Sequence, residues 1–214
     1  MTEGLLYVQS EPGSVPLAEF NDWYDNDHGP ARLALPEIRS GYRYRAIDAM
    51  TPSWLAWYEL DIDVLDGAPY QALRAHRSEK ESSLIDRLTT LDRRVYALTE
   101  DHGTPGGRSD PPPIVLCVAM NTTDEPALDA WYREEHIPIL LSLPGWRRTR
   151  RYRAVQGTGQ NLLAFHEIDT VAVFDSEAYR AAVTTERRAS VMQSVTARSR
   201  RLFGYHNTVR GTRR

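Results

Sequence analysis

The sequence predicts an α+β fold in which a β-α-β-β-α-β unit occurs twice in tandem. Three observations predict this fold: an internal repeat, a segment rich in Pro and Gly between the two copies, and the same order of apolar and amphipathic segments in each copy. The chain has 214 residues, of which 41% are hydrophobic and 26% are charged. That composition is typical of a globular protein with a proper core.

The repeat aligns FNDWYDNDHGPARLALPEIRSGYRYRA, which begins at Phe20, with LDAWYREEHIPILLSLPGWRRTRRYRA, which begins at Leu128. The offset is 128 − 20 = 108 residues, and it continues without a gap into the following strand. The matched pairs include Trp23/Trp131, Tyr24/Tyr132, His28/His136, Pro30/Pro138, Arg43/Arg151, Tyr44/Tyr152 and Arg45/Arg153. We therefore expect one unit at 1–99, a linker at 100–112 and a second unit at 113–214.

Each copy is expected to open with an apolar strand, at 4–9 and at 113–120. A helix follows and stops before a proline, Pro36 or Pro144, which cannot continue it. The later strands are expected at 38–47, 53–62, 91–98, 146–155, 161–169 and 199–206, and the later helical regions at 67–88 and 175–197. Gly157 and Gly159 are expected to form a turn. Helices cover one face of such a sheet, so two bare faces packed together would bury both and form a barrel.

Composition excludes several classes of function. The net charge of −3 and a pI near 6.1 argue against nucleic acid or an anionic membrane as a partner. No run of eighteen apolar residues and no secretory signal is visible, so we expect a cytoplasmic protein. Cys117 is the only cysteine and lies in an apolar segment, and no phosphate loop or zinc motif occurs. We therefore expect neither a metal nor a nucleotide cofactor.

A WY-x3-H-x-P motif, followed by LP and an RY-R strand, occurs in both copies. With the β-α-β-β-α-β order, it resembles the EthD-like branch of the dimeric α/β-barrel superfamily, whose units are ferredoxin-like. Members are typically single units that dimerise, so the resemblance implies that the two fused copies form an intramolecular dimeric α/β barrel. The relatives include cofactor-free isomerases, polyketide cyclases and monooxygenases, and some branches bind haem. The resemblance implies a small-molecule barrel without choosing a reaction.

Two histidines occupy the same repeat position. His28 and His136 each follow a tyrosine by four residues, so each pair shares one helix face. We expect each histidine near a helix C-terminus, where the macrodipole favours the imidazolium. There it either acts as an acid or base near neutral pH, or caps carbonyls left free before the following proline.

His166 differs, because it stands where the first copy has Tyr58. A histidine in an apolar strand is either a satisfied core residue or, if it projects into the barrel, a base found in one copy only. In the second case its expected neighbours are His136 and Tyr152. The candidate catalytic residues are therefore His166, His136, His28 and Tyr152.

Arginines recur on the second strand of each copy. Arg43 and Arg151 share one strand face with the arginines two residues on, and Tyr44 and Tyr152 point the opposite way. Such arginines either hold a carboxylate or an enolate in the barrel, or form ion pairs with the acids of the next strand, including Glu59. The candidate binding residues are Tyr44, Tyr58, Arg43, Arg151, Trp23 and Trp131.

Three functions follow from these patterns. The first is a cofactor-independent enzyme that acts on a hydrophobic, aromatic or polyketide-like molecule, neutral or anionic, by proton transfer (isomerase or cyclase) or by oxygenation. The second is a haem-dependent enzyme with His76 as the ligand. The third is a non-catalytic small-molecule binding or stress-response protein. A homodimer of the fused chain is compatible with all three.

Overall fold

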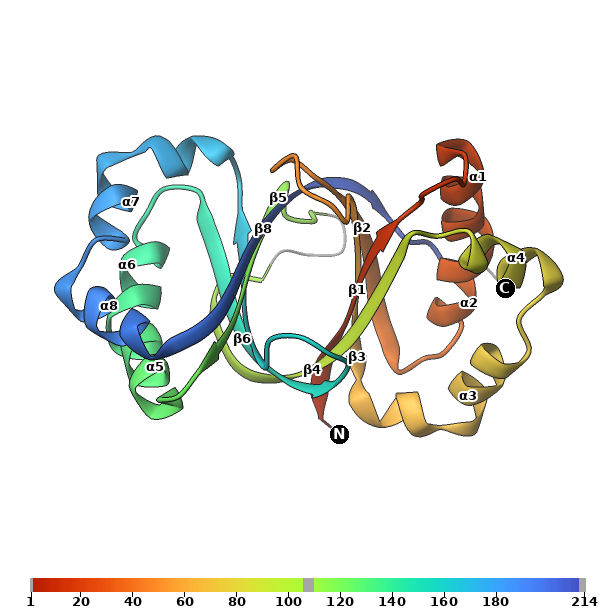
Figure 1. Cartoon of the computed structure of the whole chain (residues 1–214), viewed down its shortest axis with the longest axis horizontal. Helices are drawn as coiled ribbons and strands as arrows, with labels where there is room; N and C mark the ends of the chain where they lie inside the picture. Colours follow the sequence, from red (N-terminus) through yellow and green to blue (C-terminus); the bar gives the residue numbers. More distant parts are fainter. Residues whose placement is uncertain (1, 106–109, 212–214) are drawn as a thin grey trace. The chain divides into compact units, whose positions relative to one another are not determined.

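The computed structural model describes residues 2–105 and 110–211 (Figure 1). The first half contains β1 (Glu3–Glu11), α1 (Leu17–Asp22), η1 (Trp23–His28), α2 (Gly29–Leu33), β2 (Ile38–Ala46), β3 (Trp54–Asp61), η2 (Ile62–Asp66), α3 (Ala68–Ala75), α4 (Glu79–Asp86) and β4 (Thr90–Gly103). The second contains β5 (Ile114–Thr122), α5 (Glu125–Trp131), η3 (Tyr132–His136), α6 (Ile137–Leu141), β6 (Trp146–Gln156), β7 (Leu162–Ile168), η4 (Val171–Asp175), α7 (Glu177–Ala182), α8 (Glu186–Val191), η5 (Met192–Ser194) and β8 (Val195–Thr208). The predicted mixture of helices and strands is confirmed, and its order is the same in both halves.

The strands hydrogen-bond in the order β1-β3-β2-β8-β5-β7-β6-β4, which is that of a closed barrel. The chain divides into two compact units. The first unit takes in the described residues up to Leu98, Val155–Gly157 and those from Phe203 on, and the second takes in Thr99–Ala154 and Thr158–Leu202. β4 and β8 therefore each run through both units, and β4 includes the first four residues of the segment expected as a linker.

Some element boundaries differ from the expected ones for local reasons. The region 67–88, expected as one helical region, contains α3 and α4, because His76 leaves the helical conformation and the Ser78 side chain accepts a hydrogen bond from the Glu81 N–H as an N-cap. The turn between β6 and β7 is as predicted: Gly157 and Gly159 have φ angles of 103° and 111°.

Each unit packs helices against one face of its sheet. In the first unit, alternate residues of β1 (Leu6 and Val8) face the helices, while Tyr7 lies on the opposite face against Tyr96. The equivalent layer of the second unit contains Leu116 and Val118 of β5. The alternation of side chains along each strand therefore determines which residues face the helices. Some of these residues line the cavities described below.

The first helix of each half is interrupted by a wider turn. A continuous helix was expected, but residues Trp23–His28 and Tyr132–His136 are π-helical. Each turn ends two residues before a proline, Pro30 or Pro138. A proline has no N–H and its ring clashes with the carbonyl four residues earlier, so it disfavours the ordinary α-helical bond there. The tryptophan and the histidine five residues on are thereby brought together, with ring centres 4.4 Å apart in the first unit and 4.3 Å apart in the second.

The arginines of β2 and β6 form buried ion pairs with helix residues. Arg43 is 1% exposed and donates to Asp25 at 2.7 Å and to Asn21 at 2.8 Å. Its guanidinium also lies 4.5 Å from the ring centre of Tyr24. The acid partner therefore comes from the helix rather than from Glu59 on the next strand, which accepts a hydrogen bond from Ser40.

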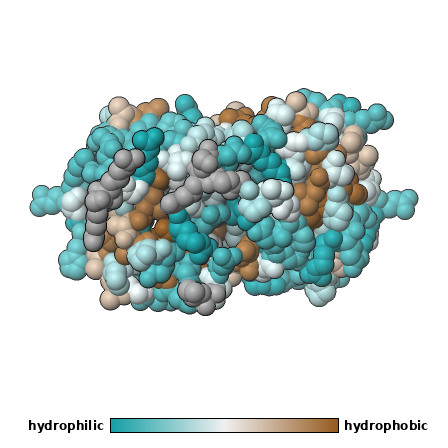
Figure 2. Space-filling model, turned by 180° about the vertical axis from the view of Figure 1, so that it is seen from behind, coloured by the Kyte–Doolittle hydropathy of each residue, from teal (hydrophilic) through white to brown (hydrophobic). Residues whose placement is uncertain are grey.

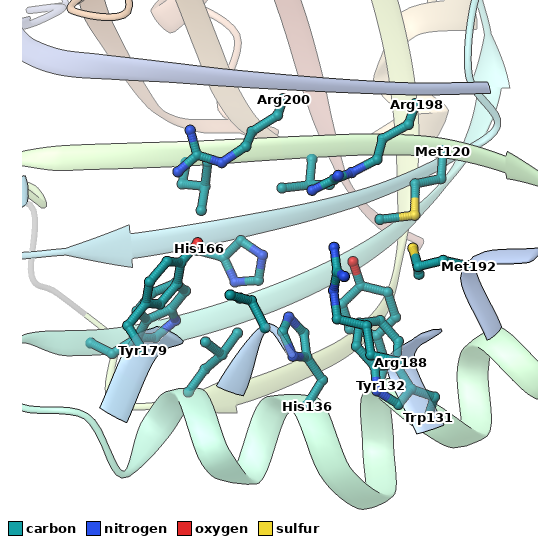
Figure 3. Close-up of a pocket in the computed structure, with 15 residues that line it drawn as sticks. Met120, Trp131, Tyr132, His136, His166, Tyr179, Arg188, Met192, Arg198 and Arg200 are labelled. Atoms are coloured by element: carbon teal, nitrogen blue, oxygen red, sulfur yellow. The ribbon is translucent and has the colours of Figure 1, made fainter. Parts of the chain in front are cut away.

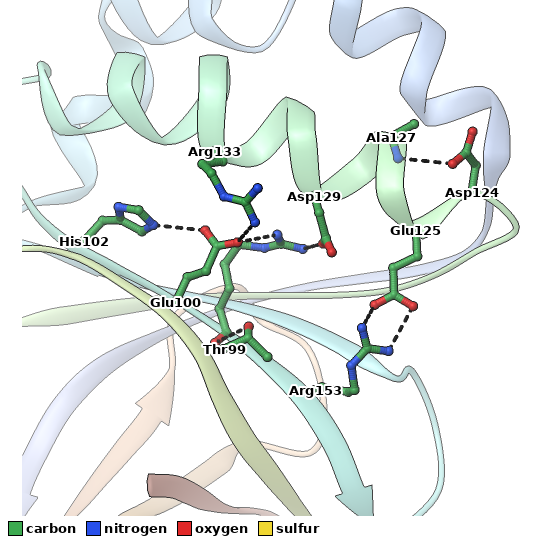
Figure 4. A network of polar contacts seen from close by, with 10 residues as sticks. Thr99, Glu100, His102, Asp124, Glu125, Ala127, Asp129, Arg133 and Arg153 are labelled. Atoms are coloured by element: carbon green, nitrogen blue, oxygen red, sulfur yellow. Dashed lines mark hydrogen bonds and ion pairs between the residues drawn. The ribbon is translucent and has the colours of Figure 1, made fainter. Parts of the chain in front are cut away.

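Arg151 repeats this arrangement in the second unit. It donates to Asp129 at 2.6 Å and lies 3.5 Å from Glu100 at the end of β4. Figure 4 shows Glu100 also receiving hydrogen bonds from His102 and Arg133. Both arginines thus fasten the first helix of a unit to its sheet.

The face of the molecule shown in Figure 2 is mostly hydrophilic, with apolar areas scattered among polar ones. Within the described ranges, no helix is long and apolar enough to cross a membrane.

Replacing Arg43 with alanine should lower the free energy of unfolding by about 2–4 kcal/mol, because Asp25 loses its partner and the space between the rings is left empty. Urea unfolding followed by circular dichroism measures this. The matched control is Arg45→Ala, an exposed position on the same strand, where the change should stay within about 0.5 kcal/mol. Equal effects of the two substitutions would contradict the structural role of Arg43.

Candidate functional site

Each unit contains a cavity between its sheet and its helices. The cavity of the first unit has a volume of about 220 Å³. Its lining residues are Leu6, Val8, His28, Arg32, Tyr58, Tyr70, Arg74, Arg77, Ile85, Leu91 and Arg93. The lining combines apolar and aromatic groups with one histidine and several arginines, and none of these residues is acidic.

His28 is held by a carboxylate from another helix. Its Nδ1 lies 2.9 Å from Oε1 of Glu81, and both side chains are about 85% buried, with 15% and 16% exposed. A carboxylate only accepts, so Nδ1 carries the hydrogen and donates it. Nε2 then has a free lone pair, and no hydrogen bond to it occurs among the described residues. The ring is therefore oriented as a base on the cavity wall.

The charge state of His28 differs from the expected one. Burial lowers the pKa of His28 to about 4, Arg32 acts in the same direction, and Glu81 opposes the shift. The helix continues past His28 through α2, so the ring lies within a helix rather than at its C-terminus. The expected preference for the imidazolium is wrong: the ring is neutral at neutral pH because desolvation outweighs its partner.

Arg32 places a buried positive charge beside this base. Its Nη1 donates to the carbonyl oxygen of His28 at 3.0 Å, and Nη2 lies 3.7 Å from Glu81. Arg74 and Arg77 are exposed and also line the cavity. Positive charge therefore extends from the surface to the interior of the cavity.

Tyr58 reaches this cavity because the strand beside it carries a glycine. Gly41 pairs with Tyr58 across β2 and β3, and a Cβ on Gly41 would lie 2.6 Å from the tyrosine ring. Burial raises the pKa of Tyr58 well above its ordinary value, so the hydroxyl stays protonated. That hydroxyl and the nearby Tyr24 hydroxyl are buried without a well-formed hydrogen bond to a described group. The two hydroxyls interact with each other, and the Tyr58 hydroxyl can turn from Tyr24 to donate to a ligand in the cavity.

The cavity of the second unit is smaller, about 30 Å³. Its lining residues are Leu116, Val118, Met120, Trp131, Tyr132, His136, Leu140, Trp146, His166, Tyr179, Val183, Arg188, Met192, Arg198 and Arg200. Figure 3 shows His136 extending from its helix toward the strand that carries His166, with Arg198 and Arg200 on the sheet side of the same space.

The tautomer of His166 follows from its neighbours. The Trp146 indole N–H donates to the Thr149 hydroxyl at 3.1 Å, and that hydroxyl lies 2.9 Å from Nδ1 of His166. When the Thr149 hydroxyl donates to Nδ1, the indole hydrogen and the hydroxyl hydrogen both form hydrogen bonds. The ring hydrogen of His166 then lies on Nε2. This geometry favours His166 as a hydrogen-bond donor rather than as a base.

The histidines of the second cavity are also neutral at neutral pH. Burial lowers the pKa of His136 to about 4, with Arg188 acting in the same direction. Burial likewise lowers the pKa of His166 well below its ordinary value, with His136 and Arg200 adding to the shift. Nδ1 of His136 forms no well-aligned hydrogen bond with a described residue, although the Ala182 backbone interacts with the ring and raises its pKa.

The two cavities occupy equivalent places but carry different groups. Tyr58 opposite Gly41 in the first unit corresponds to His166 opposite Thr149 in the second, at one offset: 166 − 58 = 149 − 41 = 108. Histidine is smaller than tyrosine, so there is room for Thr149 beside His166, and the two side chains form a hydrogen bond. The sequence already contained this paired change, which our sequence analysis did not use.

A second difference concerns the charge beside the helix histidine. Glu81 is the third residue after the N-cap Ser78, and Arg188 is the third after the N-cap Thr185. The offset is 107 in both cases, since 188 − 81 = 185 − 78 = 107. Where the first unit has a carboxylate against His28, the second has a guanidinium near His136. Aligning the two capping residues would have revealed this exchange.

Of the other predicted site residues, Trp131 lines a described cavity and the rest do not. His76 is exposed, with Nδ1 3.1 Å from the Ala72 carbonyl oxygen, and lines neither cavity. Trp23 packs on His28, whereas Trp131 both packs on His136 and lines the second cavity. Tyr44 and Tyr152 lie on the sheet faces away from these helices, and Arg43 and Arg151 form the ion pairs described above.

The buried histidines should make stability depend on pH. At pH 5 the unfolded chain binds about three more protons than the folded chain, because His28, His136 and His166 have lowered pKa values only when folded. The free energy of unfolding should be level above about pH 7.5, begin to fall as the pH drops through 6.5, and fall most steeply between about pH 6 and 5. Urea unfolding at pH 7.5, 6.5, 6.0 and 5.5 measures the slope. His166→Gln should reduce that slope by about a third, and an unchanged slope would contradict the assignment.

Comparisons with known proteins place the fold. No protein-family model and no curated protein sequence matches the chain. Among solved structures, an anthrone oxidase-like protein matches with a TM-score of 0.64 and 13% identity over 97% of this chain and 92% of the other. A proposed monooxygenase from Lactobacillus acidophilus matches with a TM-score of 0.53 and 12% identity over 98% of this chain and 96% of the other. A variant chlorite dismutase from Candidatus Nitrospira defluvii matches with a TM-score of 0.59 and 11% identity over 96% of this chain and 91% of the other. At these identities the likeness is one of fold alone, and both the dimeric α/β-barrel superfamily and its EthD-like branch stay predictions.

Proposed function

We propose that this chain is a cofactor-independent enzyme that removes a proton from a small, enolisable aromatic molecule bound in the cavity of the first unit. The observation that carries the proposal is a neutral His28, held at Nδ1 by Glu81 at 2.9 Å, on the wall of a cavity of about 220 Å³. We also infer that the two halves are copies of one ferredoxin-like unit, because their elements follow the same order.

The proposed step is a proton transfer from carbon to nitrogen. The substrate C–H bond breaks, its proton binds Nε2 of His28, and the electron pair moves onto the adjacent carbonyl oxygen to form an enolate. Glu81 stabilises the imidazolium that results. Arg32 and the Tyr58 hydroxyl can each stabilise the negative oxygen, since one is a buried cation and the other a donor without a well-formed partner.

The lining also limits the substrate. Drug-sized ligands need roughly 300–1,000 Å³, so this cavity suits a molecule of two or three fused rings at most. Leu6, Val8 and Ile85 offer apolar contacts to such rings. Arg74 and Arg77 at the surface favour a substrate with an acidic or phenolic substituent.

The enolate can continue in two ways. It can be reprotonated at another carbon, which is isomerisation or the first step of a cyclisation. Alternatively its carbon can add dioxygen, and the hydroperoxide formed after protonation loses water to leave a new carbonyl. Two structural neighbours, an anthrone oxidase-like protein and a proposed monooxygenase, favour oxygenation as the second candidate.

Haem does not fit the described cavities. Drug-sized ligands already occupy pockets of roughly 300–1,000 Å³, and a porphyrin is at least as large as such ligands. The two cavities measure about 220 and 30 Å³. His76, the ligand considered from the sequence, lies outside both. We therefore derive no step through haem.

His28→Gln should abolish most of the activity without unfolding the chain. The test follows hydrogen–deuterium exchange at the acidic carbon of anthrone and of the smaller 2-tetralone in D₂O without oxygen, and oxygen uptake in air. Loss of the base should slow exchange by about 10²–10⁴-fold. Glu81→Gln should slow it by about tenfold or more, because the imidazolium loses its counter-charge.

The matched control is His76→Gln, an exposed histidine that should leave exchange unchanged. Circular dichroism verifies folding. Wild-type protein that binds either ketone without accelerating exchange would select the non-catalytic binding protein. Full activity of folded His28→Gln would refute the base.

A further inference from the structure

We infer that the cavity of the second unit is a binding site for a small planar anion with one negative charge, of the carboxylate or nitrate type. This site is separate from the proposed catalytic cavity, so either proposal can fail while the other holds.

A buried hydrogen-bond donor lines this cavity. Nε2 of His166 carries the ring hydrogen, because Nδ1 accepts from Thr149, and the side chain is 1% exposed. His136 lies in the same lining at 9% exposed, and its ring interacts with the backbone of Ala182. A buried polar group without a partner is costly, and a bound ligand atom would satisfy it.

The charge of the lining is positive, with Arg188 half-buried and Arg198 and Arg200 exposed to solvent. Arg188, Arg198 and Arg200 contribute guanidinium groups, and no lining residue is acidic. Among the residues that the structure describes, none of the three forms an ion pair, in contrast to the neighbouring Arg187, which pairs with Glu134 at 2.7 Å. Figure 3 shows Arg188 and Arg198 beside the space in which the two histidines lie. An anion would balance this charge.

Two of these charges are specific to the second unit. Arg188 takes the place of Glu81, and Arg198 takes the place of Leu91, each at an offset of 107. The first unit therefore orients a base at the point where the second unit concentrates positive charge. Equivalent positions in the two units thus support two different binding chemistries.

The size of the cavity limits the anion. A buried water needs about 10–15 Å³ by this measure, so about 30 Å³ holds two or three waters or one compact anion. Guanidinium groups bind planar oxyanions through two parallel hydrogen bonds. Nitrate, formate and acetate meet both conditions, whereas benzoate is too large.

The test uses the full chain and defined anions. Melting temperature and the ¹⁵N NMR signals of the histidine rings are followed during titration with nitrate, formate, acetate and benzoate. Ionic strength is held constant with sodium 2-(N-morpholino)ethanesulfonate, whose anion is too large for the cavity. Nitrate, formate and acetate should raise the melting temperature saturably and shift the His136 and His166 signals, and benzoate should do neither.

Variants assign the effect to the cavity. Arg198→Gln, at an exposed position that should fold normally, should weaken nitrate binding at least about tenfold. Arg188→Glu, which restores the charge found in the first unit, should abolish it. Arg187→Gln is the matched control and should bind nitrate as the wild type does. No saturable effect of any small anion, an equal effect of benzoate, or unchanged nitrate binding in Arg198→Gln would each overturn the inference.

Discussion

Both cavities depend on a wide helical turn fixed by a proline. Pro30 and Pro138 cannot donate a backbone hydrogen bond, and the turns before them are π-helical. That geometry places a tryptophan against the histidine five residues later, tilted in the first unit and stacked in the second, and directs the histidine toward the sheet. Arg43 and Arg151 then fasten each helix to its sheet through buried ion pairs. Without this turn, the helix histidines would not lie on a cavity wall.

The two units show how one frame can hold different chemistry. The same position carries Tyr58 or His166, and the same capping turn carries Glu81 or Arg188. A carboxylate orients His28 through Nδ1 and leaves a lone pair for a substrate. A guanidinium near His136 instead opposes protonation and attracts negative charge. Differences at these two equivalent positions therefore distinguish the proposed base from the proposed anion site.

Burial sets the charge of the histidines against the simpler expectation. The nearby Glu81 carboxylate favours the imidazolium, yet the pKa of His28 falls to about 4 because desolvation is the largest effect. Burial also lowers the pKa of His136 to about 4, although the Ala182 backbone opposes the shift. A neutral imidazole ring can act as a base through its unprotonated nitrogen or as a hydrogen-bond donor through its N–H. The role of each ring follows from the group that is hydrogen-bonded to its Nδ1. That group is the Glu81 carboxylate for His28 and the Thr149 hydroxyl for His166.

The sequence by itself determined the repeated order of elements and the buried faces of the strands, because hydrophobic periodicity and proline positions act locally along the chain. It also predicted His28, Tyr58, His136 and His166 as site residues, and these four side chains line the two cavities. Only the tertiary structure decided that Glu81 reaches His28, 53 residues away, and that Arg43 belongs to an ion pair rather than to a ligand site. Such contacts join residues far apart in sequence, and the size of a cavity depends on how all its walls pack together.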